Sequence, residues 1–250
     1  MKSILSAVTT FLAVGVLSVG VVAQTPSARY DSGIQAQVTQ QLAKKSDFRN
    51  LQASTEDGIV TLSGTVNLYQ QKLDAAKKAR KVDKVQGVRN LVAVSSSSPD
   101  ADLQANLQRK LHYDRIGYDN LFNFVDVSVK NGVATLNGET RTEIGRDSAL
   151  ALANSMPGVK DVVDNVKVAP VSGFDDQIRI GAVRAIYRDP ILGRYAGDPA
   201  KPIRIVVDNG KLSLYGTVAT AADKQIAGMR ANQVFGVFSV QNNLEVAKGS

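Results

Sequence analysis

Hydrophobic residues along the chain recur with two periods, one typical of helices and one typical of strands. Apolar residues occupy every fourth position in three segments, which places an apolar stripe along one side of a helix. These stripes are Ile34, Val38 and Leu42; Leu103, Leu107 and Leu111; and Ile178, Ala182 and Ile186. Downstream of the stripes every second residue is apolar, most clearly in residues 125–129 and 203–207, which indicates strands with one buried face. The pattern predicts a protein of mixed α and β structure.

One stretch of the sequence occurs three times. Residues 57–66, DGIVTLSGTV, recur in related form at 131–140 and at 209–218, with offsets of 74 and 78 residues. Both offsets hold without a gap to the end of each unit. There Val88, Val92 and Val94 align with Val162, Val166 and Val168, and then with Val240, Leu244 and Val246. Such a register predicts three tandem copies of one module.

The pattern of each copy predicts a helix, two strands, a second helix and a third strand, in that order. A dipeptide Asp-Gly or Asn-Gly separates two alternating runs, which is typical of a hairpin with a tight turn. The glycines of this turn are Gly58, Gly132 and Gly210. Residues 98–100, Ser-Pro-Asp, predict a helix start in the second unit with Ser98 as the N-cap and Pro99 at the first helical position. The expected fold class is therefore α+β, with three tandem αββαβ modules, each a small three-stranded mixed sheet packed against two helices.

A further glycine recurs inside the second strand of each unit. These residues, Gly64, Gly138 and Gly216, share a face of the strand with the recurring leucine two positions earlier. Glycine in a strand lets another backbone approach closely. Because the next helix carries alanine pairs at i and i+4 (Ala75 and Ala79, Ala149 and Ala153, Ala227 and Ala231), we expect that helix to lie tight on the sheet at the glycine.

A Gly-Val turn precedes the last strand of two units. Gly158 and Gly236 mark this turn in the second and third units, whereas Lys84 holds the equivalent place in the first. In the first unit the turn either stays at Lys84 or shifts toward Gly87.

These motifs resemble those of a known family. The hairpin Asn/Asp-Gly-x-x-x-Leu-x-Gly, the alanine-paired helix, the Gly-Val turn and the ending at residues 165–168, NVKV, are similar to the BON domain. The chain as a whole resembles the OsmY-like group of periplasmic proteins over roughly residues 30–247. The resemblance implies the αββαβ fold, a periplasmic location, a link to osmotic or envelope stress and phospholipid binding, with no catalytic residues to carry over. We expect BON domains at residues 28–97, 98–170 and 171–248.

The first 23 residues differ in composition from the rest. Lys2 precedes an apolar run from Ile4 to Ala23, which ends in small residues before the polar residues 24–26. This arrangement is typical of a cleaved signal peptide, and the alternative is a retained membrane anchor. We therefore expect a periplasmic protein with the signal peptide at residues 1–23. The sequence contains no cysteine, which excludes lipoprotein attachment, disulfides and thiolate chemistry.

No residue pattern indicates catalysis, a metal or a cofactor. The single histidine, His112, follows the second helix stripe and has no second histidine or cysteine with which to hold a metal. Acidic residues cluster at Asp100 and Asp102, at Glu139, Glu143 and Asp147, and at Asp175 and Asp176. We interpret each cluster as a helix start, where acid complements the helix dipole. No nucleophile elbow, phosphate loop or dinucleotide fingerprint occurs, so the sequence predicts a protein that is not an enzyme.

Charge is distributed unevenly over the three units. Residues 24–98 contain 11 basic and 6 acidic side chains, residues 99–171 contain 8 and 10, and residues 172–250 contain 10 and 7. Much of the first unit's excess of positive charge lies on its second helix. We select Lys77, Lys78, Arg80 and Lys81 as candidate contacts to anionic lipid. A merely solvated helix face is the alternative. Export makes nucleic acid a poor partner.

The connection between the first helix and the hairpin is long in the second and third units. It carries Tyr113, Tyr118, Leu121 and Phe122 in the second unit, and Ile191, Leu192 and Tyr195 beside Arg188 and Arg194 in the third. These side chains suit core or inter-module packing, or else a membrane interface or a protein partner. The function that we expect is peripheral binding to anionic envelope surfaces. The alternatives are an adaptor or chaperone-like module for exported proteins, and a module that binds glycan or peptidoglycan.

Overall fold

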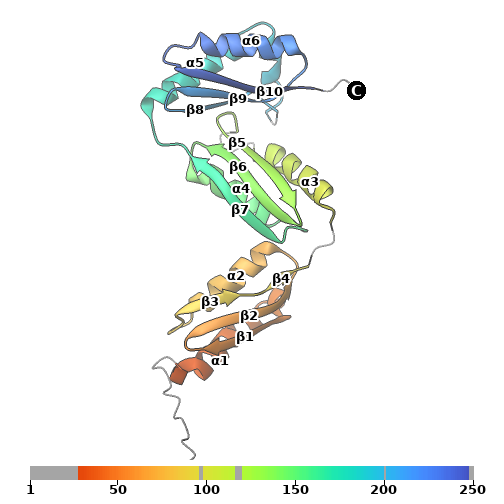
Figure 1. Cartoon of the computed structure of the whole chain (residues 1–250), viewed down its shortest axis with the longest axis vertical. Helices are drawn as coiled ribbons and strands as arrows, with labels where there is room; N and C mark the ends of the chain where they lie inside the picture. Colours follow the sequence, from red (N-terminus) through yellow and green to blue (C-terminus); the bar gives the residue numbers. More distant parts are fainter. Residues whose placement is uncertain (1–27, 96–97, 116–119, 200, 248–250) are drawn as a thin grey trace, which may run out of the picture.

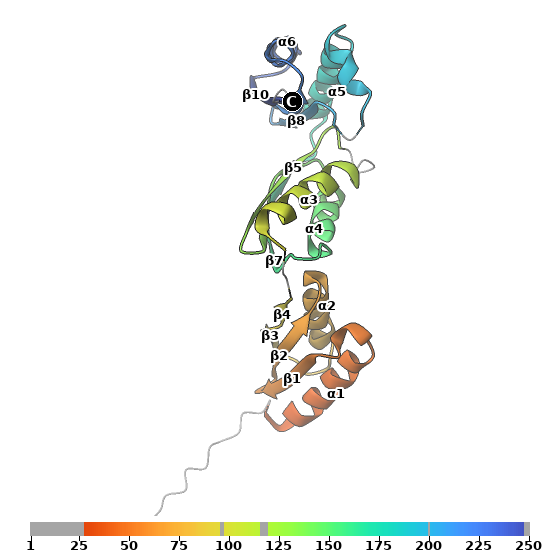
Figure 2. The same cartoon turned by 90° about the vertical axis from the view of Figure 1, so that its right-hand side faces the viewer.

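The computed structural model describes residues 28–95, 98–115, 120–199 and 201–247. Within these ranges the chain forms three modules that follow one another along the long axis of the molecule (Figure 1). Each module has one small sheet with two helices on one of its faces (Figure 2). The α+β class and the three tandem modules are confirmed. Residues 1–23, the expected signal peptide, lie outside the described residues.

The three modules share one order of elements. The first contains α1 (Asp31–Ala43), β1 (Leu51–Glu56), β2 (Ile59–Val66), α2 (Tyr69–Arg80), β3 (Gly87–Asn90) and β4 (Ala93–Val94). The second contains α3 (Asp100–Tyr113), β5 (Phe124–Lys130), β6 (Val133–Thr140), α4 (Glu143–Asn154) and β7 (Asp161–Val168). The third contains α5 (Gly173–Tyr187), β8 (Arg204–Asp208), β9 (Lys211–Val218), α6 (Ala221–Asn232) and β10 (Ser239–Val246). Short 3₁₀ helices occur at Ala28–Tyr30, Ser46–Phe48 and Leu192–Ala196.

The middle strand of each sheet pairs antiparallel with the first strand and parallel with the last. In the first module the last strand is split into β3 and β4, which both pair with β2. The turn before this strand has a positive φ in all three modules, at Lys84 (65°), Gly158 (102°) and Gly236 (87°). The turn of the first module therefore stays at Lys84, and the repeat holds without a shift.

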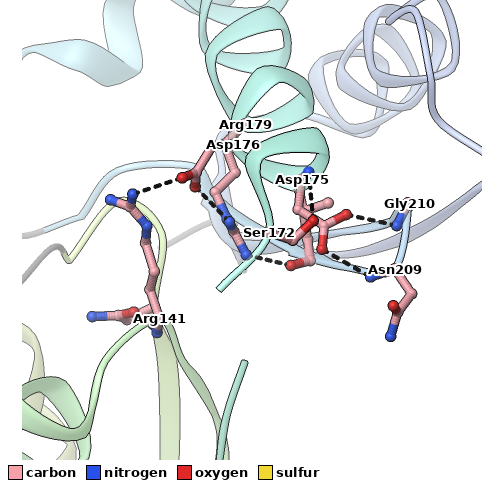
Figure 3. Close-up of polar contacts among 9 residues, drawn as sticks. Arg141, Ser172, Asp175, Asp176, Arg179, Asn209 and Gly210 are labelled. Atoms are coloured by element: carbon pink, nitrogen blue, oxygen red, sulfur yellow. Dashed lines mark hydrogen bonds and ion pairs between the residues drawn. The ribbon is translucent and has the colours of Figure 1, made fainter. Parts of the chain in front are cut away.

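The hairpin turn of every module is held by an aspartate from the first helix. Both turn residues have positive φ, for example 49° at Asn209 and 74° at Gly210, as a type I′ turn requires. The backbone N–H groups of these two residues donate to Asp175 at 3.1 and 2.8 Å (Figure 3). Asp31 and Asp100 accept from the equivalent turns of the first and second modules. These carboxylates thus join the helix start to the hairpin, which for Asp100 and Asp175 goes beyond the dipole role expected from the sequence.

Two expectations about helix starts are wrong. Helix α3 begins at Asp100, with Pro99 as the N-cap and no capping hydrogen bond from a side chain, so Ser98 is not the cap. The Asp100 carboxylate instead binds the hairpin turn. Glu139 lies in strand β6 rather than at a helix start, and Glu143 is the acid in the first turn of α4.

The glycine inside the second strand is needed for a different contact from the one expected. A Cβ added at Gly64 would lie 2.0 Å from the carbonyl oxygen of Asn50, and one at Gly138 would lie 2.1 Å from that of Phe124. The close backbone thus belongs to the start of the neighbouring strand and not to the helix. The φ angles of 111° and 129° at these two positions also favour glycine. The paired alanines are nevertheless fully buried, at 0% exposure for both Ala75 and Ala79.

Each module has its own hydrophobic core. The predicted helix stripes are buried in three separate clusters, and Val38, Leu107 and Ala182 are all 0% exposed. The three cores confirm the repeated module, because each sheet buries its apolar face against its own two helices.

The modules also contact one another. Tyr69 at the start of α2 packs against the core of the second module, where burial and then the Asp161 carboxylate raise the pKa of Tyr69 to about 12. Between the second and third modules, the Ile205 N–H donates to the Leu121 carbonyl oxygen at 2.8 Å, and Arg141 pairs with Asp176 at 3.1 Å (Figure 3).

The aromatic connections are used for packing. Phe122 of the second module packs against the core of the third, and Leu192 is fully buried in that core. The hydroxyl of Tyr195 donates to Asp223 at 2.6 Å, at the start of α6. Tyr118 lies outside the described residues. Phe122, Leu192 and Tyr195 therefore follow the packing interpretation, whereas Tyr113 and Ile191 are exposed, at 43% and 46%.

Candidate functional site

A concave basic surface lies between the two helices of the first module. Lys77 and Lys78 of α2, and Lys81 at its C-cap, border a hollow of about 250 Å³ together with Lys45, which follows α1. Gln41 and Asp74 complete its lining. We call this surface the lysine hollow.

The amphipathic pattern of α2 positions these lysines. Ala75, Ala76 and Ala79 face the core, so the remaining side of the helix faces water. Lys77 and Lys81 are one helical turn apart and share that outer side. Lysine in the last turns of a helix is also stabilised by the negative end of the helix dipole. The packing of α1 against α2 brings Lys45 to the same place.

The lysine hollow has a net positive charge. Lys45 Nζ lies 3.9 Å from Asp74 Oδ2, and the other oxygen of that carboxylate accepts from Gln70 at 3.0 Å. Among the described residues, none of Lys77, Lys78 and Lys81 has a carboxylate oxygen within 4.0 Å. Three ammonium groups therefore border the hollow, and the Asp74 carboxylate in its lining pairs with Lys45 and not with them. Such an arrangement suits a phosphate or another anion with several oxygens.

The structure gathers three of the four predicted lipid contacts. Lys77, Lys78 and Lys81 border the lysine hollow, whereas Arg80 is exposed on α2 outside it. Lys45 and Gln41 were missed from the sequence. The signal that could have found Lys45 is its place directly after the apolar stripe of α1, a helix that must cover the same sheet as α2.

A second hollow, of about 340 Å³, lies between the second and third modules. It is lined by Arg109, His112 and Asp126 on one side and by Arg204 and Glu245 on the other, among other residues. Two arginines thus face two carboxylates, so this hollow has no excess charge for an anion. The rings of Phe124 and Tyr215, which also line it, stack at 3.9 Å between centroids.

His112 lies near the end of α3, as expected, and lines this second hollow. Burial, and then the nearby positive charge of Arg204, lower the pKa of His112 to about 4, so the imidazole is neutral at neutral pH. In the part of the chain that the structure describes, no group of three His, Asp or Glu side chains is placed to hold a metal ion. The hollow thus offers no recognisable catalytic arrangement.

None of the helices that the structure describes combines sufficient length with sufficient hydrophobicity to cross a bilayer.

The repeated module can now be compared with known families. The family model of the BON domain matches residues 30–96, 99–170 and 191–248. The chain belongs to the BON domain family. The third match begins after α5, although α5 packs on the sheet of the third BON domain as α1 and α3 do in theirs. The glycines selected from the sequence lie in the turns and strands of these BON domains, all with positive φ: Gly58, Gly64, Gly132, Gly138, Gly158, Gly210, Gly216 and Gly236.

Among curated proteins, the chain is similar to osmotically inducible protein Y of Escherichia coli K12. The two are 28% identical over 147 residues, which is 55% of this chain and 72% of that protein. Among solved structures, a match covers 86% of this chain and 92% of a chain of CdsD, a structural protein of the type III secretion system of Chlamydia trachomatis, at 12% identity and a TM-score of 0.25. Another covers 84% of this chain and all of the PrgH periplasmic domain, at 13% identity and a TM-score of 0.20. Scores this low support no argument about this chain.

Proposed function

We propose that this protein is a non-enzymatic periplasmic protein that binds anionic phospholipid surfaces peripherally and acts in osmotic or envelope stress. The lysine hollow is the observation that carries the proposal, because it concentrates unpaired positive charge on one exposed surface of one BON domain. The similarity to osmotically inducible protein Y supports the stress role. The apolar segment at residues 4–23 supports export.

Elementary electrostatics sets the expected strength of binding. Each basic side chain near an anionic bilayer contributes on the order of 1 kcal/mol, and this attraction fades within a Debye length, about 8 Å at physiological salt. Three lysines at one site therefore provide weak, reversible attachment to the membrane, and added salt releases the protein. Lysine binds a lipid phosphate as a point charge, without the fixed geometry of an arginine fork, so a fluid surface suits it.

Co-sedimentation over a salt series tests the proposal. The mature protein is mixed with vesicles of phosphatidylglycerol and phosphatidylethanolamine, with zwitterionic vesicles of phosphatidylcholine, or with purified wall sacculi. We expect retention on the phosphatidylglycerol vesicles at low salt, with loss as salt rises. Retention on sacculi but on neither kind of vesicle would contradict lipid binding and favour a wall polymer as the ligand.

A triple charge reversal locates the contact. Lys77→Glu, Lys78→Glu and Lys81→Glu together should weaken vesicle binding by at least roughly 100-fold, since each lysine contributes on the order of 1 kcal/mol. The matched control reverses Lys130, Lys160 and Lys167, which are exposed in the second BON domain and change the net charge equally. Circular dichroism checks that both variants are folded. Equal loss in the two variants would mean that net charge, and not the lysine hollow, governs binding.

A further inference from the structure

The third BON domain exposes an unusual group of aromatic side chains. Phe235 and Phe238, in the turn between α6 and β10, are 95% and 77% exposed. Phe174 in the first turn of α5 is 44% exposed, and its ring centroid lies 5.9 Å from that of Phe238. Val171, just before α5, is fully exposed. We call the three phenylalanines the phenylalanine tip.

The fold itself does not require these residues. The equivalent turn positions hold Asp83 and Gln86 in the first BON domain and Pro157 and Lys160 in the second. The residue before the hairpin-binding aspartate, Phe174 in the third, is Tyr30 in the first and Pro99 in the second. All three domains nevertheless form the same turn and the same strand register. The phenylalanines therefore belong to the surface of the third domain and not to the repeated framework.

Two glycines hold the rings in place. The Cβ position of Gly210 lies 2.4 Å from Cδ2 of Phe238, and that of Gly236 lies 3.1 Å from Cζ of Phe174. The rings thus lie against the hairpin turn and the α6–β10 turn, where a larger residue than glycine would displace them. The rings of Phe238 and Phe174 thus rest against tight turns, and Phe235 beside them is 95% exposed.

The size of the phenylalanine tip favours a lipid surface over a protein partner. The exposed fractions amount to about two whole phenylalanine side chains, on the order of 400 Å². A stable protein interface needs about 800 Å² from each partner, with matching shape. A lipid interface needs no matching shape and accepts projecting aromatic side chains. Lys211, which is exposed and pairs with Ser239 beside Phe238, adds a positive charge where lipid headgroups would lie.

From these observations we propose that the phenylalanine tip inserts at the boundary between the headgroups and the acyl chains of an anionic lipid bilayer, as a second contact in addition to the lysine hollow. The inference rests on the proposed function, since it assumes that the protein reaches a lipid surface. It adds an apolar contact on the third module, which lies at the opposite end of the row of modules from the first (Figure 1).

Tryptophan fluorescence tests the insertion directly, because the sequence contains no tryptophan. Phe235→Trp places a single reporter at the tip. Ile144→Trp is the matched control, because Ile144 is also an exposed apolar residue, at 68%, on α4 of the second domain. With phosphatidylglycerol vesicles we expect the emission of Phe235→Trp to shift to shorter wavelength and to be quenched by brominated lipid chains. The control should show neither change.

The outcomes separate the tip from the proposed function. If vesicles retain Phe235→Trp but its emission does not change, the insertion is wrong while lipid binding stands. If vesicles do not retain the protein at all, both proposals are wrong. A shift that appears without vesicles as protein concentration rises would assign the tip to contact with a second copy. As a second variant, Phe235→Ser with Phe238→Ser should weaken retention about 10-fold without changing its salt dependence, whereas the triple lysine variant should flatten that dependence.

Discussion

The first and third BON domains have the same framework but surfaces of different chemical character, one basic and one apolar. In both, an aspartate at the start of the first helix binds the hairpin turn, and a glycine lies against the backbone of the neighbouring strand. On this framework the first domain presents the lysine hollow and the third presents the phenylalanine tip. The residues that recur in both domains therefore specify the fold, whereas the residues that differ between them give each domain its own surface.

The two end domains also differ in how they meet the middle one. The first contacts it where α2 meets α4 and where Tyr69 packs against its core, whereas the third shares a backbone hydrogen bond and an ion pair with it. The end domains thus share a framework and differ in the joint that connects each to the middle domain.

The largest effect is expected from Gly64→Ala in the first domain. The new Cβ would lie 2.0 Å from the Asn50 carbonyl oxygen, and the φ of 111° is unfavourable for alanine. We therefore expect the clash and the backbone strain to lower the free energy of unfolding by about 4 kcal/mol. Gly216→Ala should cost less, about 2–3 kcal/mol, because the nearest oxygen is 2.8 Å away. Urea denaturation with hydrogen exchange resolved by domain measures both.

Gly33→Ala is the control for these glycine variants. Gly33 lies within α1 and has no atom within 4 Å of its Cβ position, so alanine should stabilise the first domain by up to about 1 kcal/mol. If Gly64→Ala were as stable as the natural protein, the shared framework would not depend on this close approach.

A smaller effect is expected from removing the hairpin-binding aspartate. Asp175→Ala should cost about 2–3 kcal/mol, because it leaves two backbone N–H groups without their acceptor at a site that is 2% exposed. Asp31→Ala should cost about 1 kcal/mol, since its site is more exposed and water can replace the carboxylate. Thermal unfolding measures both. Asp102→Ala is the control for the helix dipole, because Asp102 is an exposed acid in the first turn of α3. If Asp102→Ala lowered the stability as much as Asp175→Ala, the hairpin contact would not explain the effect of Asp175→Ala.

The smallest effect concerns the joint between the second and third domains. Burial, and then the Asp208 carboxylate, raise the pKa of Glu139, so its folded form binds a proton more readily than its unfolded form. Stability should therefore fall as pH rises above the ordinary pKa of 4.5. Glu139→Gln should stabilise the protein by about 0.5–1 kcal/mol at pH 7, allowing for partial exposure, and by nothing near pH 4.

Thermal unfolding at the two pH values checks this prediction. Asp147→Asn, an exposed carboxylate on α4, is the control and should have little effect at either pH. If Glu139→Gln raised the stability equally at pH 4 and pH 7, the charge of Glu139 would not be what weakens the joint.

Much of the fold could be predicted from the sequence, because its signals are local. The stripe of Leu103, Leu107 and Leu111 and the turn at Asn209 and Gly210 follow from periodicity and backbone preference alone, and both are confirmed. The aspartate contacts could not be predicted in this way. Asp175 binds a turn that lies 34 residues later in the chain. Whether the two meet depends on where the hairpin lies in space, so the sequence shows only an acid at a helix start.

The candidate site was predicted in part for the same reason. Lys77, Lys78 and Lys81 could be selected because they share a helix with buried alanines, whereas Lys45 joins them only through the packing of α1 on α2. Phe235 and Phe238 were missed because apolar residues next to a strand are ordinarily part of a core. Only their exposed fractions show otherwise.

The most direct test compares two single substitutions on one helix. Lys78→Glu and Arg80→Glu change the net charge equally, but only Lys78 borders the lysine hollow. In co-sedimentation with phosphatidylglycerol vesicles, we expect Lys78→Glu to weaken binding about 10-fold, and Arg80→Glu about 2-fold at most. Equal weakening by the two substitutions would contradict the assignment of lipid binding to the lysine hollow.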